Sequence, residues 1–102
     1  MTTTIARDDT QNLVLPGLLG LLREAADAAG LFVAEAKPAV LAHIAPEGGK
    51  VDRKLADVHQ HRVHGYGWYA SYAELLNQVA GWAERLEAEG RFGEIEALLA
   101  QL

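Results

Sequence analysis

The feature that most constrains the fold is an apolar repeat of alternating three- and four-residue steps between Leu55 and Leu86. In an α-helix such steps place every repeat position on the same side, whereas a strand would need alternation at every second residue. The repeat fills five heptads, which predicts one long helix. Its positions are Leu55, Val58, Arg62, Gly65, Tyr69, Tyr72, Leu76, Val79, Ala83 and Leu86.

A second row of mostly apolar residues lies beside this repeat, at His61, Trp68, Leu75 and Trp82. The two rows together make the apolar side broader than the narrow seam of a coiled coil. Turn chemistry marks the limits of the helix, since residues 46–50 contain Pro and a Gly pair, and Gly90 follows the last repeat position. With Asp52 as the N-cap, we expect a helix over residues 52–89.

An earlier helix is predicted over residues 13–45, because apolar positions again alternate steps of four and three. Pro16 leaves two alternatives for its start: either the helix begins near Leu15, or a short turn precedes Pro16. Pro38 should kink this helix or end it early, and the apolar segment 39–44 favours a kink. The apolar positions are Leu18, Leu22, Ala25, Ala29, Phe32, Ala36, Ala39 and His43.

Residues 93–102 predict a third, short helix with Ile95, Leu98, Leu99 and Leu102 on its apolar side. Residues 1–9 lack periodicity and are expected to form a flexible N-terminus, so residues 10–102 form a single helical domain. The predicted fold class is all-α, a long antiparallel helical hairpin plus a short C-terminal helix. Two helices cannot enclose a core, so we expect dimerisation to complete a four-helix bundle.

The broad apolar side of the second helix predicts an interface with another polypeptide. Aromatic residues at helical spacing are more often packed than ligand-binding, although a flat ligand stacked on them is an alternative. The predicted interface residues are Trp68, Tyr69, Tyr72, Leu75, Leu76, Val79, Trp82 and Leu86.

Composition excludes several classes of protein. The 102 residues carry a formal net charge of −5, with acidic and basic residues interspersed. The sequence therefore has no cluster of basic residues of the kind that binds nucleic acid. No apolar segment approaches the ~20 residues of a membrane span, and the N-terminus lacks a signal-peptide pattern. The absence of cysteine excludes disulfides and thiolate chemistry, and is compatible with the cytoplasmic location that we expect.

Histidines near the start of the second helix are the only candidate metal ligands. His61 and His64 are three residues apart and share a helix face. Neither the Glu-x-x-His nor the His-Glu-x-x-His pattern of helical metal sites is present, so they are more simply read as hydrogen-bonded or interface residues. We find no nucleophile beside a base and predict no catalytic residue, cofactor-binding residue or metal ligand for this chain.

Three segments nevertheless resemble a known family. They are Gly-Gly-Lys-Val-Asp at 48–52, His-Gly-Tyr-Gly-Trp-Tyr-Ala-Ser-Tyr at 64–72, and Gly-Trp-Ala-Glu-Arg-Leu-Glu-Ala-Glu-Gly-Arg-Phe-Gly-Glu-Ile-Glu-Ala-Leu-Leu at 81–99. Across residues 18–102 the chain resembles the N-terminal helical extension of 2-methylsuccinyl-CoA dehydrogenase-like proteins, in the acyl-CoA dehydrogenase superfamily. In that family the extension precedes a body that binds FAD and carries the catalytic carboxylate and CoA-ester pocket. The resemblance implies an origin and a partner, and no catalytic residue is carried over.

Two classes of function follow from the sequence. The first is a non-catalytic helical interaction module, either a homodimer or a module that docks on an acyl-CoA dehydrogenase-type flavoprotein. The alternative is a small ligand- or metal-binding helical bundle that uses the histidines and aromatic residues of the second helix. A catalytic enzyme in its own right is disfavoured by the residue inventory.

Overall fold

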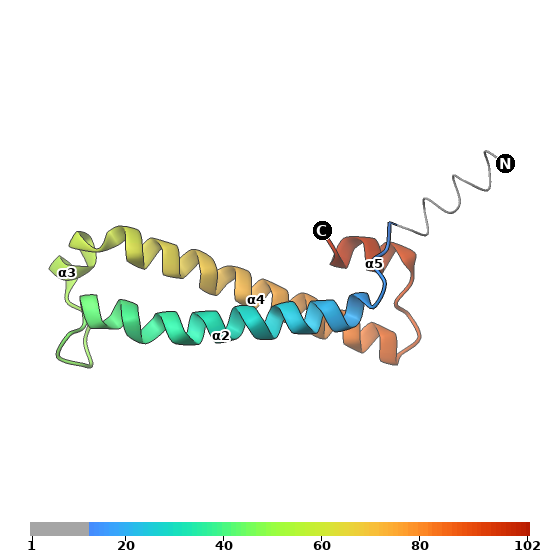
Figure 1. Ribbon diagram of the computed structural model, residues 1–102, viewed down its shortest axis with the longest axis horizontal. Coiled ribbons are helices and arrows are strands. Elements are labelled where there is room, and N and C mark those ends of the chain that lie inside the picture. The colour runs from blue at the N-terminus through green and yellow to red at the C-terminus, as the bar shows by residue number, and fades with distance from the viewer. Residues whose placement is uncertain (1–12) are drawn as a thin grey trace.

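A computed structural model describes residues 13–102, and within them every regular element is helical (Figure 1). Helix α2 (Leu18–Ile44) and helix α4 (Gln60–Ala88) run side by side in opposite directions. The short helix α3 (Arg53–Val58) lies at one end of this hairpin and α5 (Glu94–Ala100) at the other. The predicted all-α fold, a long hairpin followed by a short C-terminal helix, is confirmed. The predicted flexible N-terminus and the domain start at residue 10 lie outside the described residues.

The structure decides two alternatives that the sequence left open for α2, one at Pro16 and one at Pro38. Pro16 lies in a turn, and the helix begins at Leu18 after Gly17, whose φ of 66° is readily adopted only by glycine. At Pro38 the helix neither ends nor breaks but continues to Ile44, where the N–H of Ala45 donates to the carbonyl of Leu41. The apolar segment after Pro38 therefore remains packed as helix.

The connection after α2 closes one end of the hairpin, which we call the closed end. Gly48 and Gly49 both have positive φ, as their position in a tight turn requires. The carboxylate of Asp52 then accepts hydrogen bonds from the backbone N–H groups of Lys54 (2.9 Å) and Leu55 (3.2 Å). The predicted N-cap at Asp52 is thus confirmed, and it begins α3.

The segment 52–89, predicted as one helix, is instead two helices separated at His59. At the junction the N–H of His59 donates to the carbonyl of Leu55 (2.9 Å), and the N–H of Val63 donates to the carbonyl of His59 (3.1 Å). The ring of His59 lies 4.7 Å from the ring of His43 on α2. Sequence periodicity could not reveal this bend, because a contact with another helix accompanies it and neither Gly nor Pro marks it.

The seam between α2 and α4 is built mainly from alanine. Of the nine buried apolar residues in the described chain, six are alanines. Ala80 and Ala83 are the most enclosed, at 1% and 0% exposed. Small side chains let two helix axes approach closely, but each contributes little apolar burial. The core residues are Leu18, Leu22, Ala26, Ala80, Ala83 and Ala97, with Ile44, Ala45 and Ala73 buried outside this cluster.

This seam is displaced from the one that the apolar repeats predict. On α2 the repeat positions Leu18 and Leu22 are buried as predicted, but the next buried residue is Ala26 rather than Ala25, and Phe32 is exposed. On α4 Ala73 and Ala80 are buried, whereas Tyr69 and Tyr72 are exposed. In the middle of the hairpin the helices therefore meet along small residues and leave Phe32, Tyr69 and Tyr72 outside the contact, whereas Leu18 and Leu22 are buried nearer the open end.

Helix α5 packs across the opposite end, which we call the open end. Ala97 is buried in the core, and Phe92 contacts Trp82 edge to face with ring centroids 6.3 Å apart. The side chain of Gln101 accepts a hydrogen bond from the N–H of Leu15 (3.0 Å) and donates to the carbonyl of Leu13. These bonds tie α5 to the turn before α2. No helix in the described chain is long and apolar enough to cross a membrane.

Replacing Ala80 with Leu should destabilise the fold, because the added side chain has no space in the closely packed seam. Overpacking of this kind costs about 1–3 kcal/mol of unfolding free energy, measurable by urea denaturation. Ala28→Leu, at an exposed position of α2, is the matched control and should change stability little. Equal effects of the two substitutions would show that the alanine seam does not limit helix approach.

The closed end should lose stability in mild acid. Desolvation lowers the pKa of His59 from its ordinary 6.5, and nearby His43 and Arg62 lower it further. The folded state therefore binds this proton less readily than the unfolded state, so stability is full above pH 6.5 and falls as the pH drops through the folded pKa. His59→Gln should reduce the pH dependence of the unfolding free energy, whereas His61→Gln, at an exposed position of α4, serves as the control. If both variants retain the wild-type pH profile, the contact between His43 and His59 is not the cause.

Candidate functional site

The most prominent surface feature is a set of large apolar side chains on one side of the hairpin. We call it the aromatic face and define it as Phe32 of α2 with Trp68, Tyr69, Tyr72 and Leu75 of α4. Each of these side chains is more than half exposed. Single exposed apolar residues are normal, whereas a contiguous group of large ones is a candidate interaction surface.

Ring contacts join the aromatic face into one patch. Phe32 meets Tyr69 edge to face across the two helices, with ring centroids 5.1 Å apart. Trp68 lies 5.5 Å from Tyr72 on α4. Tyr72 also lines two adjoining shallow hollows, one between the helices and one on the outer side of α4. The apolar surface therefore extends from the helix seam around α4 without interruption.

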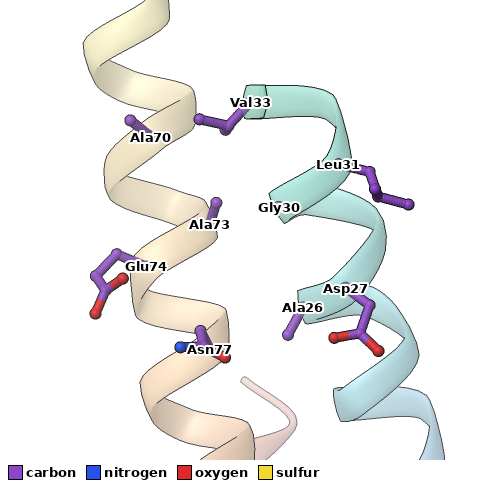
Figure 2. A pocket seen from close by; sticks show the side chains of 9 residues that line it. All are labelled: Ala26, Asp27, Gly30, Leu31, Val33, Ala70, Ala73, Glu74 and Asn77. Atoms are coloured by element: carbon purple, nitrogen blue, oxygen red, sulfur yellow. The ribbon is translucent and has the colours of Figure 1, made fainter. Parts of the chain in front are cut away.

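The hairpin has two long grooves, and they differ in chemistry. Both are lined by Val33 and Ala73, and so lie on opposite sides of the same seam. The groove on the side of the aromatic face is otherwise lined by Ala29, Phe32, Tyr69, Tyr72 and Leu76. The other contains Asp27, Glu74 and Asn77 (Figure 2). Only the second groove has the charged lining expected of a surface that remains in water.

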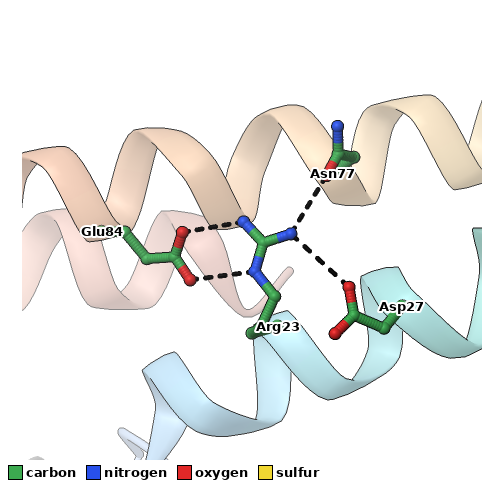
Figure 3. Close-up of polar contacts among 4 residues, drawn as sticks. All are labelled: Arg23, Asp27, Asn77 and Glu84. Atoms are coloured by element: carbon green, nitrogen blue, oxygen red, sulfur yellow. Dashed lines mark hydrogen bonds and ion pairs between the residues drawn. The ribbon is translucent and has the colours of Figure 1, made fainter.

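Polar side chains on that second side are bonded to one another (Figure 3). The guanidinium of Arg23 donates two hydrogen bonds to the carboxylate of Glu84, at 2.7 and 2.9 Å, and a third to Asn77 at 3.1 Å. Arg23 Nη1 also lies 3.7 Å from Asp27 Oδ1. The bond to Glu84 raises the pKa of Arg23, and the bond to Arg23 lowers the pKa of Glu84. This bidentate pair links α2 to α4 and fixes their relative register.

The other predicted interface residues take different positions. Leu76 and Val79 are partly buried and pack against the core. Trp82 also packs there and contacts Phe92, while Leu86 is half-buried. The structure therefore brings Trp68, Tyr69, Tyr72 and Leu75 together on the surface. It places Leu76 in the groove beside Phe32 and Tyr72, and Trp82 against Phe92 near α5. Phe32, absent from the predicted interface, joins the face from α2. Its place in the apolar repeat of 13–45 was the available signal.

The two candidate metal ligands do not form a ligand set. His64 Nε2 accepts a hydrogen bond from the indole N–H of Trp68, which occupies one of the two ring nitrogens through which a histidine can bind a metal. His61 is exposed and lines a shallow depression with His64 and Asp57. Across residues 13–102 no three His, Cys, Asp or Glu side chains are grouped so that they could hold a metal ion.

Comparison with known proteins identifies one informative similarity. No protein-family model matches the chain, and no solved structure matches it. A 54-residue stretch is 50% identical to a (2S)-methylsuccinyl-CoA dehydrogenase of Cereibacter sphaeroides. That stretch is 53% of this chain but only 10% of the dehydrogenase.

The matched stretch is a large share of this chain and a small share of the relative. Identity of 50% over 54 residues supports the relationship that the motifs at 48–52, 64–72 and 81–99 suggest. The matched stretch is about a tenth of the length of the relative, so the activity of the whole relative does not transfer with the match. Over about half of its residues, this helical hairpin is therefore related to an acyl-CoA dehydrogenase-like protein.

Proposed function

We propose that this chain is a non-catalytic helical interaction module, equivalent to the N-terminal helical extension of an acyl-CoA dehydrogenase-type flavoprotein. Its function is to associate with another polypeptide through the aromatic face. In the related full-length enzymes the flavin and CoA-ester sites would belong to the remaining part of the protein. We also propose that the module is cytoplasmic.

One observation carries this proposal: the hairpin leaves five large apolar side chains, three of them Trp or Tyr, exposed together on one face. The seam buries mainly alanine, while five large side chains form a continuous uncharged patch. A buried Trp or Tyr contributes far more apolar area than alanine, so covering this face would remove a large apolar area from water. Aromatic residues at the centre of a patch are also the usual anchors of protein interfaces.

Two polypeptides are candidates to cover the face. A second copy of the chain would complete a four-helix bundle, and the body of a flavoprotein would provide a docking site. The ligand-binding alternative has less support, because the hollow beside Phe32 and Tyr72 is a wide shallow groove, not an enclosed pocket.

Tyr72→Glu should abolish the association, because it places a carboxylate at the junction of the two apolar hollows. An unpaired charge buried in an interface is strongly unfavourable, and we expect the Kd to rise by more than about tenfold. Sedimentation velocity of the chain, alone and mixed with (2S)-methylsuccinyl-CoA dehydrogenase, measures both candidate associations.

Ala34→Glu is the matched control, since Ala34 is exposed on α2 one turn after Gly30, which lines the charged groove. It adds the same charge on the other side of the hairpin and should leave association unchanged. Far-UV circular dichroism verifies that both variants remain helical. A wild-type chain that binds neither itself nor the dehydrogenase would refute the proposed function, as would a Tyr72→Glu variant that associates normally.

A further inference from the structure

Charge along the hairpin is distributed in three zones. The closed end, residues 35–64, has five basic and four acidic residues together with all four histidines of the chain. The open end, residues 13–27 and 74–102, has three basic and eight acidic residues. Between them, residues 28–34 of α2 and 65–73 of α4 contain no charged residue at all. The hairpin is thus weakly basic at one end, acidic at the other and neutral in the middle.

The neutral zone coincides with the centre of the aromatic face. Phe32 lies close to the midpoint of α2, and its ring contacts Tyr69 on α4. Trp68 and Tyr72 extend the same zone along α4. An uncharged centre between oppositely charged ends is the pattern of a surface that is complementary to itself when one copy is turned end over end.

We infer that the aromatic face binds a second copy of this chain, turned end over end so that the closed end of each copy lies against the open end of the other. This inference rests on the proposed function and names the partner. The two hairpins form a four-helix bundle about a two-fold axis that passes beside Phe32 and Tyr72. Each α2 then lies over the α2 of the other copy in the reverse direction.

Electrostatics selects this orientation over the other two-fold arrangement. If both closed ends lay together, the two acidic open ends would also meet. Each has an excess of five acidic residues over its whole surface, and of three when Arg23, Asp27, Glu74 and Glu84 on the side of the charged groove are left out. Like charges at that distance repel, and the repulsion is only partly screened at physiological salt. The end-over-end arrangement instead places each acidic end against the weakly basic, histidine-containing end.

The available area is adequate for such a dimer. The 27 residues of α2 span about 40 Å, and two packed helices are about 20 Å wide. One side of the hairpin therefore offers on the order of 800 Å², which matches the contribution of each partner to a stable protein interface. A small area can be sufficient here because aromatic residues occupy its centre.

Single cysteines in this cysteine-free chain test the arrangement. Ala25 and Ala39 are exposed positions of the apolar repeat, each seven residues from Phe32. In the end-over-end dimer Ala25 of one copy faces Ala39 of the other, whereas two copies of Ala25 lie about 21 Å apart along the axis. A disulfide needs Cα atoms within about 7 Å.

An oxidised mixture of Ala25→Cys and Ala39→Cys chains should therefore yield about tenfold more disulfide-linked dimer than either variant alone. A mixture of Ala34→Cys with Ala39→Cys is the control, since Ala34 lies on the side of the charged groove. Mass spectrometry identifies the linked pair, and sedimentation of the wild-type chain measures the dimer without any substitution.

Each result decides the inference. A wild-type dimer with the mixed 25–39 disulfide supports it. Efficient linking of either variant to itself, or a dimer without the mixed disulfide, overturns the arrangement and leaves the proposed function intact. If the chain is a monomer that binds the dehydrogenase, the partner is not a second copy and the inference is refuted, while the proposed function still stands. A monomer that binds neither overturns both.

Discussion

Close contact between small side chains on α2 and α4 is the interaction on which the rest of the structure depends. Ala80 and Ala83 are almost fully enclosed, and Ala26 and Ala73 are buried on the two sides of the seam. Alanine allows the helices to approach but removes little apolar area from water. The hairpin therefore has a close helix contact but leaves Phe32, Trp68, Tyr69, Tyr72 and Leu75 exposed.

The consequence is a separation of two tasks between the two sides of the hairpin. On one side Arg23 forms a bidentate pair with Glu84 and bonds to Asn77, so the polar groups satisfy one another within the chain. On the other side Phe32, Tyr69 and Tyr72 face outward with no charged residue among them. The first side holds the helices in register, and the second is available to another polypeptide.

The relationship to a methylsuccinyl-CoA dehydrogenase fits this separation. The matched stretch is half of this chain and a tenth of the relative, so the shared unit is a small helical part of a much larger protein. A helical unit whose main apolar surface faces outward is suited to association. The bend at His59, where the rings of His43 and His59 meet, shapes the end of the hairpin beyond that surface.

Periodicity and turn chemistry in the sequence predicted the long helices and the short C-terminal helix, although they did not separate α3 from α4. Repeats of three and four residues predicted the segments around α2, α4 and α5, and Asp52 was correctly identified as an N-cap. These features are local, since each depends on residues within one or two turns. The motifs in 64–72 and 81–99 likewise indicated the relationship to the dehydrogenase.

Only the tertiary structure decided which side of each helix is buried. An apolar stripe as broad as that of α4 is compatible with several rotations about the helix axis, and periodicity cannot choose among them. The close approach of alanines selected a rotation that buries Ala73 and exposes Tyr72. The break at His59 accompanies a contact with α2, and the place of Phe32 beside Tyr69 depends on the pairing of two helices far apart in sequence.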